Sequence, residues 1–196
     1  MKRLNITFLV LFFTVFTVLG QKKISIGSFT STGVTFKVSP STNKDWLHIN
    51  PTTQAKNLPN PDQINGVDLE YIMPEIKLSK SENEIHDIVR EAIKADEMKN
   101  NTLNRTQDVI FILITLDPNQ TEHKLETVDF MVKANTLYTG TEIGNVYKSL
   151  FDKYRPVLTS KNNVHKQLKT YKIVYKYEAT GKVVVEPPRP PRGKKD

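Results

Sequence analysis

The segment Val109–Leu116 constrains the fold more than any other, because it is an unbroken run in which both alternating faces are almost wholly apolar. It is rich in β-branched and aromatic residues and lies between Asp108 and Asp117, so we predict a strand. A strand of this kind needs a cover on each side of its sheet. One face carries Val109, Phe111 and Leu113, and the other carries Ile110, Ile112 and Ile114.

Two segments have the apolar spacing of amphipathic helices. The first follows Ser81 and Glu84, which have the spacing of a capping box, and its polar side includes His86, a predicted surface residue. The second begins at Gly140 and ends before Pro156. The predicted core residues of the two helices are Ile85, Ile88, Val89, Ala92, Ile93, Ile143, Val146, Tyr147, Leu150, Phe151 and Tyr154.

Alternating patterns predict three further strands. Residues 67–72 read as a half-buried strand that Pro74 ends, and residues 124–134 as the partner of 109–116 in an antiparallel hairpin. Residues 171–177 have one largely apolar and one largely polar face, and a short return strand at 183–185 follows the turn at Gly181.

The region before residue 67 is less regular. Residues 24–29 and 34–38 are β-prone and predict a hairpin with a four-residue turn, Thr30 to Gly33. Residues 39–66 contain four prolines among polar residues. Their apolar residues follow neither the spacing of a helix nor the alternation of a strand, so we predict a long irregular connection. Such loops are uncommon inside compact domains unless they are functional, which draws attention to Trp46 and His48. The competing interpretation is that Trp46 only pins the loop to the core.

The order strand, helix, strand, strand, helix, strand predicts an α+β fold, a two-layer sandwich with two helices on one face of an antiparallel sheet. The N-terminal hairpin and long loop are additions to this split βαβ pattern. Without its first strand, the order over residues 82–178 resembles the C-terminal domains of the TonB and TolA envelope proteins, which implies helices packed on a short antiparallel sheet. Three covers are open for the second face of 109–116: the hairpin with loop 39–66, which we favour, a second subunit or a ligand groove.

The N-terminus reads as a targeting segment. Lys2 and Arg3 precede the apolar run Ile6–Leu19, which is shorter than the ~20 residues that a membrane-spanning helix needs. We predict a signal peptide cut before Gln21, with an uncleaved signal anchor as the alternative, and expect a periplasmic or secreted protein without a later transmembrane segment. The predicted divisions are 1–20, the signal peptide; 21–66, the hairpin and loop; 67–186, the α+β domain; and 187–196, a Pro-rich basic tail.

A leader followed directly by Gln21, a chain without cysteine and a composition rich in Lys, Asn and Thr resemble small uncharacterised exported proteins of Bacteroidetes-type bacteria. The resemblance implies an envelope compartment and a domain of unknown function, and it implies no reaction.

Composition excludes several kinds of chemistry. With no cysteine, the chain has no disulfide, thiolate zinc site or cysteine nucleophile. Its four histidines are scattered without metal-ligand spacing, and no GxSxG segment occurs, so we predict no metal site, no cofactor and no catalytic residue. Residues 148–196 carry 13 basic and 4 acidic side chains, a charge that favours anionic partners, but an exported protein seldom meets nucleic acid and we expect none there.

The strand at 171–177 supplies the first binding hypothesis. Its tyrosines can stack on sugars or peptide side chains, and its lysines can contact acidic groups, although tyrosines on the buried face of a strand are commonly core. The candidate binding residues are Tyr171, Lys172, Tyr175, Lys176, Tyr177, Trp46 and His48, with tail contacts from Arg189, Arg192, Lys194 and Lys195.

We therefore predict an exported, non-catalytic protein that binds a protein or glycan partner in the cell envelope. One alternative is a small hydrolase with its site in loop 39–66 around Asp45 and His48, which requires a hydroxyl or carboxylate within reach of His48. Another is a structural homodimer through the uncovered sheet face, which predicts a doubled mass that Ile112→Lys abolishes.

Overall fold

The computed structural model describes residues 23–53, 60–80, 82–100, 108–118 and 125–178, and every structural statement below concerns these residues. The predicted signal peptide, the capping residue Ser81, the return strand at 183–185 and the basic tail lie outside them.

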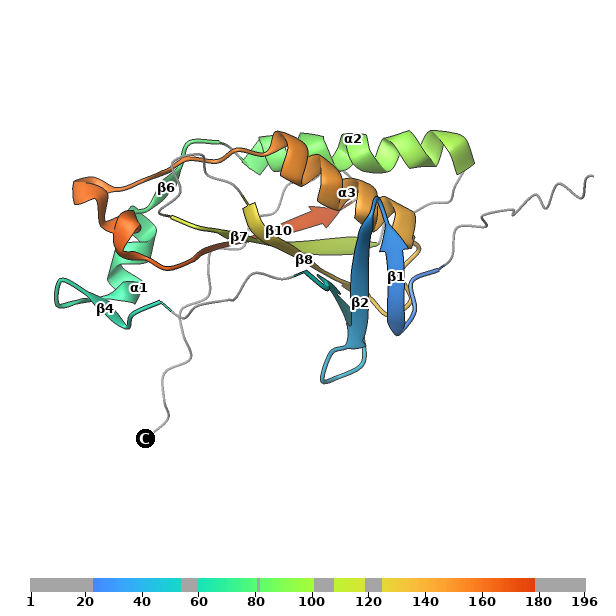
Figure 1. The fold of residues 1–196 in the computed structure, drawn as a ribbon, viewed down its shortest axis with the longest axis horizontal. Helices are drawn as coiled ribbons and strands as arrows, with labels where there is room; N and C mark the ends of the chain where they lie inside the picture. The colour runs from blue at the N-terminus through green and yellow to red at the C-terminus, as the bar shows by residue number, and fades with distance from the viewer. Residues whose placement is uncertain (1–22, 54–59, 81, 101–107, 119–124, 179–196) are drawn as a thin grey trace, which may run out of the picture.

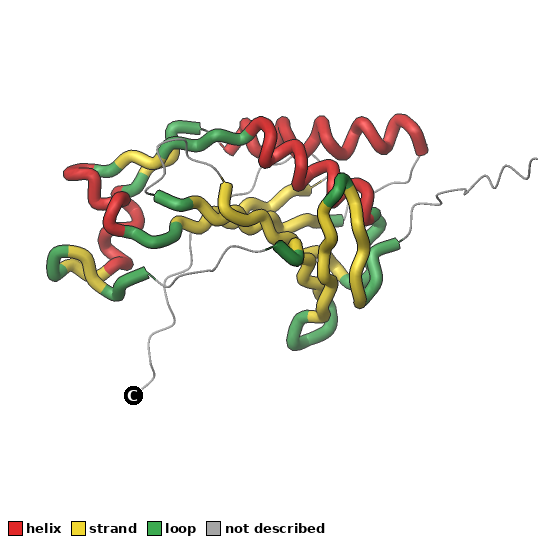
Figure 2. The backbone as a smooth tube through the Cα atoms, in the orientation of Figure 1, coloured by secondary structure: helices red, strands yellow, loops and turns green. Residues whose placement is uncertain are grey.

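A six-stranded sheet forms the centre of the structure, and every neighbouring pair of its strands is antiparallel. Figures 1 and 2 show two long helices on one side of this sheet, which confirms the predicted α+β fold with helices on one face. In spatial order the strands are β1 (Gly27–Ser31), β2 (Val34–Pro40), β3 (Trp46–Pro51), β8 (Leu125–Lys133), β7 (Val109–Leu116) and β10 (Tyr171–Glu178).

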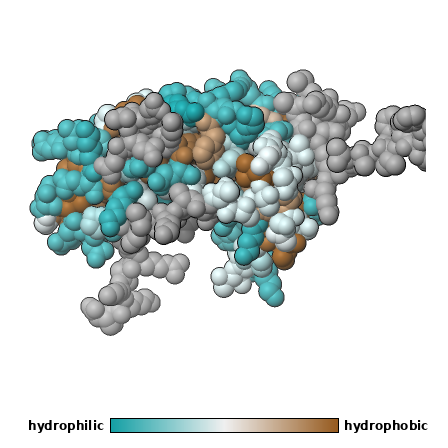
Figure 3. All heavy atoms as spheres, in the orientation of Figure 1, coloured by the Kyte–Doolittle hydropathy of each residue, from teal (hydrophilic) through white to brown (hydrophobic). Residues whose placement is uncertain are grey.

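The helices are α2 (Glu82–Asn100) and α3 (Gly140–Lys153), both as the apolar spacing predicted. Thr139 and Glu142 form a capping box at the start of α3, with the Thr139 N–H donating to Glu142 Oε2 over 2.8 Å. The outer surface of α2 is hydrophilic in Figure 3. No described helix combines the length and apolar character that crossing a bilayer requires.

The helix-facing side of the sheet is the core, and its residues meet in register across the strands. Tyr175 on β10 lies opposite Ile112 on β7, which in turn lies opposite Phe130 on β8. Ile49 on β3 and Val38 on β2 continue the same row. All five side chains are buried on this side of the sheet.

The prediction that the N-terminal hairpin covers the second sheet face is wrong. The hairpin exists, but its turn has only two residues, Thr32 and Gly33, which adopt left-handed φ values of 52° and 81°. Residues 39–66 also contain β3, which joins β2 to β8 edge to edge. The N-terminal strands therefore extend the sheet instead of lying over it.

The prediction of a strand over 67–72 is also wrong. Only Val67–Asp68 (β5) is extended, and it pairs with Gln63–Ile64 (β4) across the left-handed turn residues Asn65 and Gly66. The chain then forms one short helical segment over 69–72 and a 3₁₀ turn over 73–75, in which Pro74 lies near the start, a position that proline favours. The remaining short elements are α1 (Leu69–Ile72), η1 (Met73–Glu75), β6 (Lys77–Leu78), β9 (Leu158–Thr159) and η2 (Lys161–Gln167).

The hairpin is held against α3 by a close approach at Gly144. A Cβ added there would lie 2.5 Å from the Ser31 Cβ, so a larger residue would push β1 away from the helix. The Thr32 hydroxyl also donates to the Gly144 carbonyl over 3.1 Å. Gly140 and Gly144, which make no phosphate loop, thus serve helix–strand packing.

His86 is a core residue and not the predicted surface residue. It is 7% exposed, its Nδ1 lies 2.9 Å from the Tyr175 hydroxyl, and its ring packs on Tyr177 at a centroid distance of 5.3 Å. Burial lowers the pKa of His86 below its ordinary value; the charge of Arg90 adds to the effect and that of Asp87 opposes it.

We expect the free energy of unfolding to fall as the pH drops from 7 to 5. The unfolded chain takes up a proton on His86 near its ordinary pKa of 6.5, whereas the folded protein does so only at a lower pH, so acid favours the unfolded state. Urea unfolding at several pH values measures this slope. His86→Gln should flatten it, and an equal slope in the variant and the parent would contradict the assignment to His86.

Candidate functional site

The side of the sheet opposite α2 and α3 is the candidate site, and we call it the open face. Its transverse row of His48, Met131, Phe111 and Lys176 runs across β3, β8, β7 and β10. Neighbouring strands lie about 4.8 Å apart, so this row spans roughly 14 Å from His48 to Lys176. The other open-face residues used below are Trp46, Leu113, Asp129, Lys133, Lys172, Val174 and Glu178.

The structure divides the predicted binding residues between the two sides of the sheet. Tyr171, Tyr175 and Tyr177 are 9%, 1% and 5% exposed and face the helices, so the core interpretation of these tyrosines holds and they are removed from the binding surface. Burial also raises the pKa of Tyr171, which keeps its hydroxyl neutral. By contrast, the remaining four residues share the open face: Trp46, His48, Lys172 and Lys176.

The centre of the open face is apolar and partly accessible. Phe111, Leu113 and Met131 are half-buried, while Val174 is 37% exposed. The Trp46 ring meets the edge of Phe111 at a centroid distance of 5.4 Å and an interplanar angle of 65°, a favourable aromatic geometry. Contiguous, partly accessible apolar side chains on one sheet face are a feature of contact surfaces.

Charged residues surround the apolar centre. Lys172 and Lys176 alternate with Val174 along β10, and Lys133 lies opposite Trp46. Lys176 pairs with Glu178 over 2.5 Å, at side chains that are each 25% exposed. The surface therefore combines an apolar centre with a charged border, in which three lysines alternate with the carboxylates of Asp129 and Glu178.

The hydrolase alternative finds no geometric support at His48. The histidine is exposed on β3, and in the described part of the chain no hydroxyl or carboxylate hydrogen-bonds to it. Asp45 is exposed in the turn before β3. Among the described residues, no three His, Cys, Asp or Glu side chains are grouped so that they could hold a metal ion.

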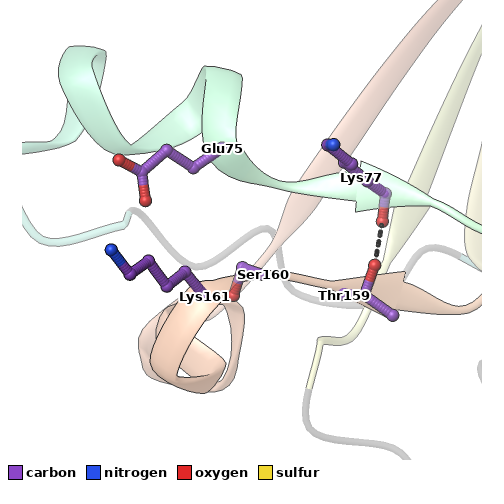
Figure 4. Close-up of a pocket in the computed structure, with 5 residues that line it drawn as sticks. All are labelled: Glu75, Lys77, Thr159, Ser160 and Lys161. Carbon is purple, nitrogen blue, oxygen red and sulfur yellow. Dashed lines mark hydrogen bonds between the residues drawn. The ribbon is translucent and has the colours of Figure 1, made fainter.

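A separate cavity of about 410 Å³ lies at the end of the molecule that holds η1, β6, β9 and η2. Figure 4 shows Glu75 and Lys161 extending toward the same side of this cavity, while the Thr159 hydroxyl donates to the Lys77 carbonyl over 3.4 Å. The fifth lining residue is Ser160. Sequence reasoning named none of these residues.

Ser160 fixes the turn that borders this cavity. Its Oγ lies 2.8 Å from His165 Nδ1 and accepts the His165 backbone N–H over 3.0 Å. Between them, Asn162 and Asn163 adopt left-handed φ values of 54° and 55°. Because one oxygen serves both the ring and the backbone of the same residue, the pair closes a local turn and does not resemble an activated nucleophile.

The open face contains residues that sequence reasoning did not select, chiefly Met131 and Lys133. The sequence signal that could have identified them lies on the neighbouring strand, where Leu47, His48 and Ile49 alternate, with His48 polar between two apolar residues. Taken as a strand, this segment adds an edge to the sheet, and its outward residues then join those of β8 and β7.

No family model matches the chain, and the search of curated proteins finds no match. Among solved structures, a crystal structure of a DUF5043 family protein from Bacteroides uniformis superposes with a TM-score of 0.59 at 16% sequence identity. The match covers 86% of this chain and 92% of that chain. The two proteins share a fold.

An identity this low shows the fold alone. The neighbour comes from a Bacteroidetes bacterium and its family name denotes a domain of unknown function, so the resemblance inferred from sequence style is confirmed at that level. The positions of Trp46, Phe111 and Lys176 on the open face therefore carry the functional argument.

Proposed function

We propose that the protein is an exported, non-catalytic binding protein of the cell envelope whose open face contacts a protein or glycan partner. The observation that carries the proposal is the gathering of Trp46, His48, Lys172 and Lys176 on one accessible sheet face. These residues come from β3 and β10, which are far apart in the sequence and separated by two strands in the sheet.

The chemistry of the face supports binding better than catalysis. Aromatic and aliphatic side chains at its centre supply contact area, and the lysines at its border supply attraction for anionic groups. The basic tail, with Arg189, Arg192, Lys194 and Lys195, adds a second electrostatic contact in this proposal. The proposal of export rests on the predicted signal peptide over residues 1–20. We expect N-terminal sequencing of the protein purified from the envelope to begin at Gln21.

A photo-crosslinking amino acid placed at Met131 tests the proposal in the full chain. We expect it to crosslink in the native envelope to one dominant partner, whereas the same amino acid at Asn83, on the exposed surface of α2, should not. Adding Leu113→Lys should abolish the Met131 adduct, because it puts an ammonium group into the apolar centre. Adding Asn83→Lys, a matched change of charge on the helix layer, should leave the adduct intact.

The size of the adduct separates the partner classes. An adduct of about twice the mass of the mature chain that contains only this protein would favour the homodimer and overturn the proposal. Ile112→Lys does not test that dimer, because Ile112 is fully buried on the helix side. Equal crosslinking from Met131 and Asn83, or an adduct that survives Leu113→Lys, would also contradict binding through the open face.

A further inference from the structure

The outer edge of β10 has no partner strand among the described residues, and we call it the β10 edge. The strand is eight residues long and contains no proline. A long open edge presents a row of backbone donors and acceptors with which another segment can pair, so proteins ordinarily cover or protect it. The chain outside the described part begins directly after this strand and covers residues 179–196.

The neighbouring strands fix the direction of the backbone groups on β10. In an antiparallel sheet, the N–H and C=O of one residue point to the same side, and successive residues alternate. The Ala134 N–H donates to the Asp45 carbonyl over 2.8 Å, so Ala134 and every second residue before it on β8 point to β3. Met131 therefore points to its partner Phe111 on β7, and Phe111 points back to β8.

Carried one strand further, this alternation turns every second residue of β10 toward the β10 edge. These residues are Lys172, Val174, Lys176 and Glu178. The contacts of Thr170 agree with it, because Asn60 Nδ2 donates to the Thr170 carbonyl over 2.8 Å and the Thr170 N–H donates to Asn60 Oδ1 over 3.0 Å. Both backbone groups of Thr170 thus bond to a residue outside β7, and the β10 edge begins after it.

The sequence after β10 fits a hairpin that returns along this edge. Glu178 points outward and can pair with Lys182 across the three-residue loop 179–181. Such a loop is a type I turn followed by a left-handed residue, and Gly181 occupies that third position. A two-residue loop, as in the β1–β2 hairpin, would have to close on Ala179, which points to the β7 side by the same alternation.

The three-residue loop also gives the returning segment a register in which the side chains match. It places two valines on the helix-facing side and a lysine opposite a glutamate on the open face, and both kinds of cross-strand pair are favourable. The opposite pairs are Val183 with Tyr177, Val185 with Tyr175, and Lys182 with Glu178. A four-residue loop would shift the register by one residue and place both valines on the open face.

We propose that residues 182–186 pair with the β10 edge as a seventh strand of the sheet. Pro187–Pro188 then ends the ladder, because proline has no N–H to donate. The pairing adds Lys182, Val184 and Glu186 to the open face and starts the basic tail at its border. The pairing stands on the backbone directions and the loop sequence, whereas the part of these side chains in binding rests on the proposed function.

Two proline substitutions in the full-length chain test the pairing. In this register the Val184 N–H points to β10 and the Val185 N–H points to solvent, so only Val184→Pro removes a hydrogen bond of the ladder. We expect the Lys176 N–H to exchange with deuterium about tenfold faster, or more, in Val184→Pro than in the parent, measured by NMR. Val185→Pro is the matched control and should stay within about threefold of the parent.

Two results would contradict the proposal. Equal exchange of the Lys176 N–H in all three proteins would overturn the pairing. A larger effect of Val185→Pro than of Val184→Pro would overturn the register, because a four-residue loop exchanges the roles of the two valines.

Engineered disulfides give an independent measurement, because the chain has no cysteine of its own. Lys176 and Val184 lie directly opposite each other in the proposed register, about 5.5 Å apart between Cα atoms, which a disulfide can span. Lys176→Cys with Val184→Cys should oxidise about tenfold faster than Lys176→Cys with Val185→Cys, whose second side chain points to the other side of the sheet. Mass spectrometry after alkylation counts the remaining thiols. Equal rates, or the reverse order, would contradict the register.

A photo-crosslinking amino acid at Val184 tests the place of this segment in the binding surface. It should capture the same partner as the one at Met131, because both positions belong to the open face in the proposed arrangement. A different adduct, or none, would remove residues 182–186 from the binding surface.

The pairing and the proposed function fail separately. If the Met131 adduct forms and depends on Leu113 but the Lys176 N–H exchanges equally in all three proteins, the proposed function stands and the seventh strand is lost. If the exchange and disulfide results are as expected but no adduct forms at Met131, the seventh strand stands and the binding function is lost.

Discussion

Replacing Phe36 with Ala should lower the free energy of unfolding by about 3–5 kcal/mol. Phe36 is fully buried on β2 and links three parts of the molecule. Its ring stacks on Phe29 of β1 at 5.1 Å, meets Phe130 of β8 at 6.5 Å and meets Tyr147 of α3 at 5.3 Å. The substitution leaves a cavity at the point where the N-terminal strands, the central sheet and the helix layer come together.

Guanidinium unfolding followed by circular dichroism measures the effect. Lys37→Ala, at the next and exposed position of the same strand, is the matched control and should change stability by no more than about 0.5 kcal/mol. A loss below about 1 kcal/mol for Phe36→Ala would mean that β1–β3 unfold separately from the rest of the sheet. The denaturant dependence would then also fall, because less surface is exposed in the main transition.

The sequence predicted the elements whose period is strong and locally complete. α2, α3, β7, β8 and β10 all lie where the periodicity placed them, and β7 begins and ends at the predicted residues. The helix–strand order was therefore enough for the fold class. The alternation on β10 also separated the buried Tyr175 from the outward Lys176.

The missed features have different causes. β3 ends at Pro51, and its short alternation is stabilised by pairing with β2 on one side and, across many intervening residues, with β8 on the other. The short strands β4 and β5 pair with each other around the Asn65–Gly66 turn. That turn is a local signal that was available in the sequence. His86 was available too, because it lies three and seven residues before Val89 and Ile93 on the buried side of α2.

Only half of the candidate site lies on a strand that the sequence predicted. Lys172 and Lys176 were identified from a strand that the sequence shows clearly, whereas Trp46 and His48 were identified from a segment taken as a loop. Only the antiparallel register brings them together, since it sets His48 beside Met131 and Lys176 beside Phe111. Register across four strands depends on long-range pairing, which a single sequence does not show.

Replacing Asp108 with Ala should cost about 3 kcal/mol, because its carboxylate organises the segment between β8 and α3. One oxygen accepts the Val109 N–H over 3.0 Å, and the other accepts the Thr136 hydroxyl over 2.8 Å and the Leu137 N–H over 2.7 Å. Asp108 is buried, so the substitution leaves these donors without a partner in a site that admits little water.

Two controls separate the hydrogen bonds from the charge. Asp108→Asn keeps the shape and one acceptor oxygen, so it should cost less than Asp108→Ala. Asp152→Ala removes the carboxylate from an exposed pair with Lys148 and should change stability by less than about 1 kcal/mol. Thermal unfolding of the three variants measures the differences, and equal losses for Asp108→Ala and Asp152→Ala would contradict an organising role for Asp108.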